Sequence, residues 1–200
     1  MSRSNWSAVR VFPSPASITS APLGRAAFSS SARFQPLAAL SGCQTTDELP
    51  TDRLGQATLR LASGLPAGTV QLLASGSQLN VSVALAGVPE GVHGVHLHKV
   101  GSCEAPGFES AGGHLDPAGR QHGTQNPAGA HLGDLPNVTI GGSGAGTVSA
   151  TLRGTREEVL AHLFDADGTA IVVHAGADDY RTDPSGNSGA RIACGVLTRT

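Results

Sequence analysis

Aromatic residues and lysine are scarce in this chain of 200 residues. Only Phe108, Phe164 and Tyr180 follow residue 46, and Lys99 is the single lysine. A core in the longer, second part of the chain must therefore consist of valine, leucine, isoleucine and alanine. Long apolar runs are also missing. Because none approaches the roughly 18 residues that a membrane-spanning helix needs, the sequence predicts no such helix.

The chain also has little charge. Charged residues make up 14% of the sequence, and the formal net charge is −2. This balance excludes the strongly basic surface typical of nucleic-acid-binding proteins, so no nucleic-acid partner is expected. The length suits one domain, or one domain with a tail. The 27 glycines and 12 prolines indicate many turns. Their share of the sequence is nevertheless below that typical of a disordered chain.

The first 46 residues differ in composition from the rest. They contain four arginines and no acidic residue, whereas all 15 acidic residues lie in residues 47–200, which carry a formal net charge of −6. A segment rich in arginine and serine and free of acids is typical of an organelle transit peptide or an export leader. We therefore expect a leader, targeting or disordered segment at residues 1–46 and one domain at residues 47–200.

Cys43 ends the sequence LSGC at residues 40–43, which resembles the site at which bacterial lipoproteins are cleaved and lipidated. The apolar run before it, residues 37–40, is shorter than the roughly 7–15 residues of a signal-peptide core. Three interpretations stay open: a lipoprotein leader with membrane attachment through Cys43, another kind of export leader, and a disordered or mis-started N-terminus.

Apolar and polar residues alternate in three stretches, which is typical of strands with one buried face. These stretches are residues 57–61, 79–85 and 148–152. Short apolar segments bounded by turn residues predict further strands at 69–74, 92–98, 160–164, 170–173 and 191–197. Since no convincing helical stripe is present, we expect an all-β, eight-stranded antiparallel Greek-key barrel or immunoglobulin-like sandwich. Two glycine- and proline-rich stretches, 101–136 and 176–190, predict long functional loops.

The histidines carry the chemical signal. His96 and His98 lie in the predicted strand 92–98, where alternate residues share a face, so both imidazoles point at one site. On a helix they would diverge by about 200°. His174 follows the predicted strand 170–173 and supplies a third nitrogen, and an all-imidazole set suits copper. The first long loop contains a second set, typical of tetrahedral Zn²⁺: His114, His122, His131 and Asp134.

Five motifs carry a resemblance to a known family. They are GVHLH at 94–98, SAGGHLDP at 110–117, HLGDLPN at 131–137, VVH at 172–174 and GARIACG at 189–195. In this order they make residues 56–197 similar to copper/zinc superoxide dismutases of the bacterial exported type, themselves an example of the sandwich architecture. The resemblance implies disproportionation of superoxide to dioxygen and hydrogen peroxide, with long metal-binding and electrostatic loops.

The resemblance also implies ligands for both metals. Copper would be held by His96, His98, His114 and His174, and zinc by His114, His122, His131 and Asp134. His114 would then be catalytic as well, as an imidazolate that bridges the two ions. Asp178 matches the carboxylate that links a copper-ligand histidine to a zinc-ligand histidine and fixes the orientation of both rings.

Two further features follow from the resemblance. Arg191 would be a catalytic residue that docks the superoxide anion beside the copper. Cys103 and Cys194 would form a disulfide, which favours export to the periplasm or cell envelope. Three further basic residues could add positive charge at the rim of the site, and the sequence does not rank them: Lys99, Arg120 and Arg181.

His93 matches a structural position in the family, and nothing converges on His162 in the predicted strand 160–164. Two other functions are alternatives to a superoxide dismutase activity: a metal-binding or metal-delivery domain and a zinc hydrolase. A domain of the same fold could bind or deliver metal without turnover. A zinc hydrolase needs an open zinc position, and Asp134 closes this one. Monomer and homodimer both fit the sequence.

Overall fold

The computed structural model describes residues 51–200. The predicted leader and Cys43 lie outside the described residues. The strands are β1 (Thr51–Leu61), β2 (Pro66–Ser75), β3 (Gln78–Ala86), β4 (Gly91–His93), β5 (Val95–His98), β6 (Val138–Ile140), β7 (Ala145–Thr151), β8 (Ala170–His174), β9 (Arg191–Val196) and β10 (Thr198–Arg199). A 3-10 helix η1 (Glu109–Ala111) and one α-helix, α1 (Arg156–Leu163), complete this part of the chain. Neither of these helices has the length and apolarity to cross a membrane.

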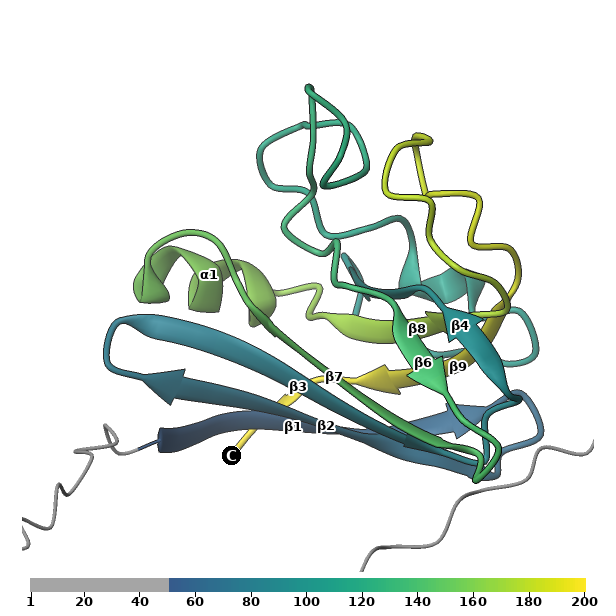
Figure 1. Cartoon of the computed structure of the whole chain (residues 1–200). Helices are drawn as coiled ribbons and strands as arrows, with labels where there is room; N and C mark the ends of the chain where they lie inside the picture. Colours follow the sequence, from purple (N-terminus) through teal and green to yellow (C-terminus); the bar gives the residue numbers. More distant parts are fainter. Residues whose placement is uncertain (1–50) are drawn as a thin grey trace, which may run out of the picture. The chain divides into compact units, whose positions relative to one another are not determined.

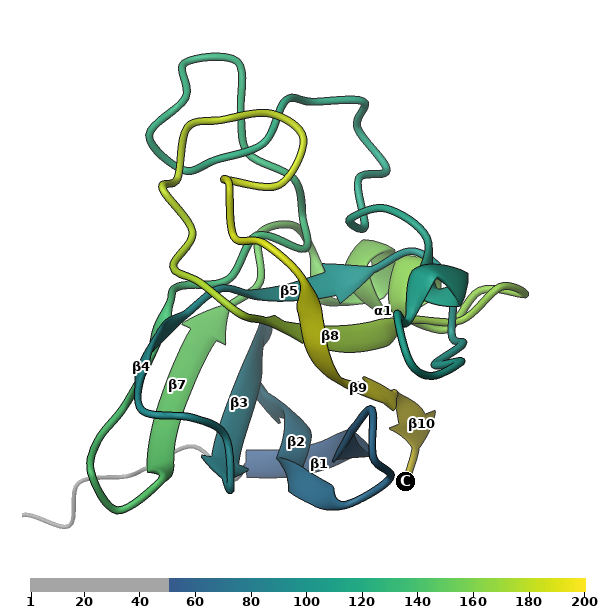
Figure 2. The same ribbon diagram turned by 90° about the vertical axis from the view of Figure 1, so that its right-hand side faces the viewer.

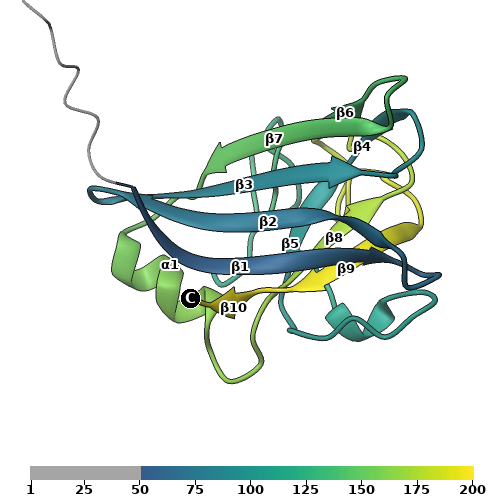
Figure 3. The same ribbon diagram turned by 90° about the horizontal axis from the view of Figure 1, so that it is seen from below.

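Eight strands form one antiparallel sheet in the order β5-β8-β9-β1-β2-β3-β7, with β10 paired to β1, and β4 pairs separately with β6. The sheet turns back on itself between β9 and β1, so that β5 and β8 lie over the layer of β1, β2, β3 and β7 (Figures 1 and 3). β7 pairs with β3 although β4, β5 and β6 lie between them in the chain, as a Greek key requires. The predicted all-β fold is confirmed.

The core between the layers is aliphatic, as the composition predicts. Alternate residues of β1, β2 and β3 are buried, in agreement with the period of two in the sequence. Leu59, Leu72, Leu97 and Ile171 are fully buried and come from both layers. Every residue of β5 and β8 is buried, because loops cover the face of these strands that does not face the core.

The strand predicted at 160–164 is wrong, because residues 156–163 form α1. Thr155 caps this helix: its side chain accepts a hydrogen bond from the backbone N–H of Glu158, and the Glu158 carboxylate accepts one from the backbone N–H of Thr155. Val159 and Leu163, four residues apart, are buried on one face. The apolar run that suggested a strand is the end of this helix. His162 therefore lies on α1.

The predicted strand 92–98 is two strands, β4 and β5, which belong to different sheets. The break falls at Gly94, whose backbone N–H donates to Gly176 O and whose carbonyl accepts from His174 N. The strand β6 is absent from the sequence prediction, since three residues are too few to show a period. Its pairing with β4 is purely a consequence of the tertiary fold.

Two long loops stand side by side above β5 and β8 (Figure 2). We call residues 99–137 the first loop and residues 175–190 the second loop. The disulfide between Cys103 and Cys194, with Cα atoms 5.7 Å apart, ties the first loop to β9. The cysteine pairing implied by the resemblance is confirmed.

Loss of this disulfide is expected to lower the free energy of unfolding by about 4 kcal/mol. The two cysteines are 91 residues apart, so the bond restricts a large loop in the unfolded chain. Urea unfolding of the metal-free double variant Cys103→Ala/Cys194→Ala measures the effect. Reduction of the wild-type bond should give the same loss. An effect of the double variant alone would indicate lost side-chain packing at Cys194 instead.

Candidate metal and anion site

Strand β5 places alternate side chains in two environments. Val95 and Leu97 belong to the hydrophobic core, while His96 and His98 lie on the opposite face, under the loops. β8 runs antiparallel beside β5 and ends at His174. The alternation that sequence analysis predicted therefore brings three imidazoles from two neighbouring strands to one place.

Four buried imidazoles meet there, and each offers a ring nitrogen within 4.8 Å of the others. We call them the four-imidazole group: His96, His98, His114 and His174. His98 Nδ1 lies 2.9 Å from Gly112 O, and His174 Nδ1 lies 3.1 Å from Gly189 O. These contacts leave the opposite nitrogen of each ring free. Four nitrogens are buried without a hydrogen-bond partner among the described residues: His96 Nδ1, His98 Nε2, His114 Nε2 and His174 Nε2.

A second cluster, which we call the mixed group, consists of His114, His122, His131 and Asp134. Asp134 Oδ1 lies 2.9 Å from His122 Nδ1, 3.0 Å from His114 Nδ1 and 3.2 Å from His131 Nδ1. The Nδ1 atoms of His114 and His131 are 3.4 Å apart. Four ligands at about 2.0 Å from a tetrahedral Zn²⁺ are separated by about 3.3 Å, so this spacing suits that ion.

Asp178 connects the two groups. Its Oδ2 lies 2.9 Å from His96 Nε2 and its Oδ1 lies 2.9 Å from His122 Nε2, and all three side chains are fully buried. One carboxylate thus fixes a ring of each group. Gly186 makes room for it: a Cβ there would collide with the Asp178 carboxylate, and the residue has a φ of +63°.

The electrostatics of the two groups differ. Burial lowers the pKa of His96 to about 3, that of His98 to about 2 and that of His174 to about 4, so these rings are neutral. Burial also disfavours the charged form of His122, but the carboxylates of Asp134 and Asp178 outweigh it and raise the pKa to about 9. In the metal-free protein, the His122 imidazolium therefore carries a positive charge that partly neutralises the carboxylates of Asp134 and Asp178.

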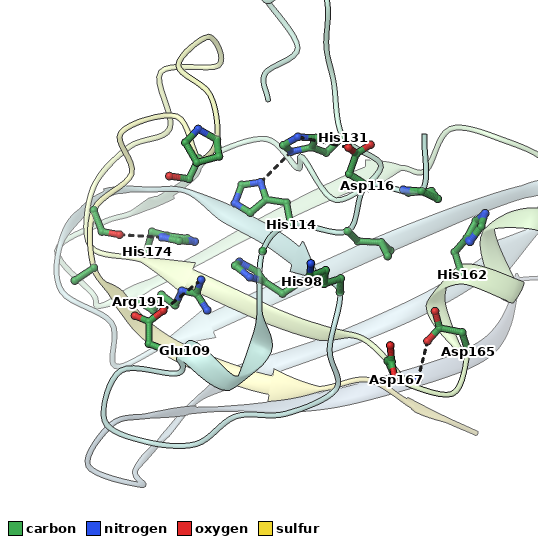
Figure 4. Close-up of a pocket in the computed structure, with 18 residues that line it drawn as sticks. His98, Glu109, His114, Asp116, His131, His162, Asp165, Asp167, His174 and Arg191 are labelled. Atoms are coloured by element: carbon green, nitrogen blue, oxygen red, sulfur yellow. Dashed lines mark hydrogen bonds and ion pairs between the residues drawn. The ribbon is translucent and has the colours of Figure 1, made fainter. Parts of the chain in front are cut away.

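A cavity of about 870 Å³ opens onto His98, His114 and His174 (Figure 4). Arg191 lies in its wall and donates to Phe108 O and Gly112 O, each at 2.7 Å.

The carboxylate of Glu109 lies 3.7 Å from the Arg191 guanidinium and is largely exposed. Of the three rim candidates, only Lys99 is among the described residues that line the cavity. Arg120 instead donates to Gly129 O, and Arg181 donates to the side chain of Gln125.

The residues that join the two loops have no signature in the sequence. The Asn137 side chain pairs with the backbone N–H and C=O of Asp178, both at 2.9 Å, and Asp183 accepts from the backbone N–H of His122 at 2.6 Å. These partners are far apart in sequence, so no local pattern reveals them.

His93 lies outside both groups, with its ring nitrogens against Pro89 O and His174 O. His162 lines the cavity from α1, away from the groups (Figure 4).

Comparison with known proteins identifies the family. The copper/zinc superoxide dismutase family matches residues 66–197, and the chain belongs to it. Superoxide dismutase [Cu-Zn] 2 of Aquifex aeolicus is 38% identical over 152 residues, which cover 73% of this chain and 87% of that protein. Superoxide dismutase-like protein YojM of Bacillus subtilis is 47% identical over 106 residues, about half of each chain (52% and 54%). The crystal structure of a SOD-like protein from Bacillus subtilis superposes with a TM-score of 0.65 at 34% identity, covering 74% of this chain and 100% of that one.

In the metal-free protein, His122 is expected to keep its proton up to about pH 9. Since its pKa is raised from 6.5, its contribution to stability is complete below pH 6.5 and is lost as the pH rises through 9. Long-range ¹H–¹⁵N NMR of the imidazoles measures the titration. Asp178→Asn should lower the midpoint. A wild-type midpoint near 6.5 would contradict the interpretation.

Proposed function

We propose that this protein is a superoxide dismutase that converts two superoxide anions and two protons to dioxygen and hydrogen peroxide. One observation carries the proposal: the four-imidazole group and the mixed group share His114. Its Nδ1 contacts only members of the mixed group, and its Nε2 is buried without a partner among the described residues. Such a ring is suited to bind two different metal ions at once.

The donor atoms fit copper and zinc. We assign copper to the four-imidazole group, because its unpartnered buried nitrogens require a cation and neutral imidazole is a preferred copper ligand. We assign zinc to the mixed group, because three imidazoles and a carboxylate at tetrahedral spacing suit this ion. Four protein ligands leave no open zinc position, which argues against a zinc hydrolase.

Bound copper supplies the one-electron chemistry on superoxide, and bound zinc supplies a fixed positive charge beside it. The chain supplies the capture of the anion. Two of the five guanidinium N–H donors of Arg191 are held by backbone carbonyls, so the group is fixed while other donors stay free for an anion. Since residues 47–200 carry a formal net charge of −6, this local positive charge is needed for capture.

The chain also supplies a place for a proton. His114 Nε2, like His98 Nε2 and His174 Nε2, is a buried ring nitrogen without a partner among the described residues, and all three rings line the cavity. Whenever His114 Nε2 is not bound to copper, it can hold a proton and donate it to a superoxide anion in the cavity as hydrogen peroxide forms. Asp178 and the backbone carbonyls keep the neighbouring rings oriented.

We further propose that the protein is exported to the periplasm or cell envelope, with a leader within residues 1–46 that is cleaved before Cys43, so that Cys43 carries the lipid. Support comes from the disulfide, which favours an oxidising compartment, and from the acid-free composition of the leader. Mass spectrometry of the mature N-terminus tests both points, and an intact, unmodified residue 1 would refute them. Both monomer and homodimer are compatible with this proposal.

Superoxide decay measured with the metal-free, zinc-loaded and copper/zinc-loaded protein tests the activity. We expect rapid decay only when copper is present, together with a copper electron paramagnetic resonance signal typical of nitrogen ligands. Activity of the zinc-only protein would contradict the mechanism. Copper binding without turnover would instead indicate a metal-delivery or storage protein.

Replacement of Arg191 by alanine is expected to lower kcat/KM about tenfold, because the anion loses its positive docking group. Copper content should not change, since among the described residues the guanidinium contacts Phe108 O, Gly112 O and Glu109 but no ring of the four-imidazole group, and His98 keeps its own contact to Gly112 O. Superoxide kinetics and metal analysis on the same sample measure both. An equal loss of bound copper would defeat the docking assignment.

Glu109→Gln is the matched control, and it should change kcat/KM in the opposite direction to Arg191→Ala. It removes the negative charge 3.7 Å from the guanidinium and leaves Arg191 in place. We expect kcat/KM to rise about twofold at low ionic strength and the difference to shrink as salt is added. Arg60→Ala, on the exposed end of β1, should leave the rate unchanged.

A further inference from the structure

Arg153 makes a contact that the proposed reaction does not use. It lies in the connection between β7 and α1, and its Nη2 donates to the backbone carbonyl of His131 at 3.0 Å. His131 belongs to the mixed group through Nδ1, and its Nε2 lies 3.2 Å from Arg120 O. Arg153 therefore holds the main chain of a candidate ligand from a part of the fold outside both loops.

Two surface clefts border this contact, one of about 370 Å³ and one of about 460 Å³. Among the described residues, only Leu132 and Arg153 line both clefts. Arg153 therefore reaches the His131 carbonyl at the boundary between them.

Other ties to residues 130–135 come from a different direction. Leu97 N donates to Gly133 O, and Gly133 N donates to Leu115 O, both at 2.9 Å. These bonds fix the side of the segment that faces β5. Among the described residues, the bond from Arg153 is the one hydrogen bond that joins residues 130–135 to residues 145–163.

We propose that Arg153 is a positioning residue for the mixed group: by holding the His131 carbonyl it keeps the Nδ1 of that ring in place and slows the loss of zinc. This inference rests on the proposed assignment of zinc to the mixed group. The charged guanidinium makes a stronger bond to the carbonyl than a neutral donor does.

Zinc release from the fully metallated, full-length protein to an excess of chelator tests the proposal. We expect Arg153→Ala to release zinc about three- to tenfold faster. Loss of a side chain that orients a metal ligand typically lowers metal affinity about 10- to 100-fold, and Arg153 acts only on the backbone of His131, so its effect should be smaller. Cobalt(II) in the mixed group gives a second readout, because displacement of the His131 ring changes its visible absorption spectrum.

Arg156→Ala is the matched control. Arg156 is the first residue of α1, three residues after Arg153. Its guanidinium likewise donates to a backbone carbonyl, that of Gly76 at 3.4 Å, which belongs to neither loop. It should release zinc at the wild-type rate with an unchanged cobalt spectrum. Urea unfolding of both metal-free variants shows whether either merely destabilises the fold.

The outcomes separate the two proposals. Wild-type zinc release and an unchanged cobalt spectrum in Arg153→Ala, or an equal effect of Arg156→Ala, would overturn the role of Arg153. His131→Ala tests the zinc assignment itself, since it removes a ligand. If His131→Ala retains zinc like the wild type, the assignment fails. If His131→Ala loses zinc while Arg153→Ala does not, only the positioning role fails.

Discussion

The shared imidazole of His114 is the constraint on which the site depends. Buried polar atoms are normally paired, yet four ring nitrogens of the four-imidazole group have no partner among the described residues. In the mixed group, three ring nitrogens crowd around one oxygen of Asp134. The unpartnered nitrogens are unfavourable without a cation between them, whereas the contacts to Asp134 are hydrogen bonds that outweigh burial and lower the pKa of that carboxyl group. The rest of the fold must therefore hold the rings in positions that they would not keep by themselves.

Three kinds of support hold these rings. The alternation of β5 separates core residues from the buried histidines, so that packing of Leu97 also fixes the strand beneath His96 and His98. Asp178 orients a ring of each group from the second loop, and Asn137 fixes Asp178 in turn. The disulfide anchors the first loop to β9 near Arg191. A rigid barrel thus restrains two loops that have little regular structure of their own.

Much of this arrangement is visible in the sequence, for physical reasons that also set its limits. A period of two predicts both the strands and the common direction of His96 and His98, because it is a local property of the chain. α1 was missed because only Val159 and Leu163 are buried on so short a helix. The contacts of Arg153 with His131, and of Asp183 with His122, join segments that the sequence separates by 22 and 61 residues. No local pattern encodes such pairs, since they depend on how the loops fold over the barrel.

The charge distribution explains how an acidic domain can receive an anion. Four acidic residues line the cavity, Glu109, Asp116, Asp165 and Asp167, whereas Lys99 and Arg191 are its two cationic side chains among the described residues. Long-range attraction to the domain as a whole is therefore absent, and the potential that matters acts within about one Debye length of the opening, roughly 8 Å at physiological salt. At that range the charges that line the cavity matter more than distant ones, and the Glu109 carboxylate, 3.7 Å from the Arg191 guanidinium, offsets part of its attraction for an anion. The rate of anion capture then depends on a few side chains at the rim, while the buried groups beneath them determine the chemistry.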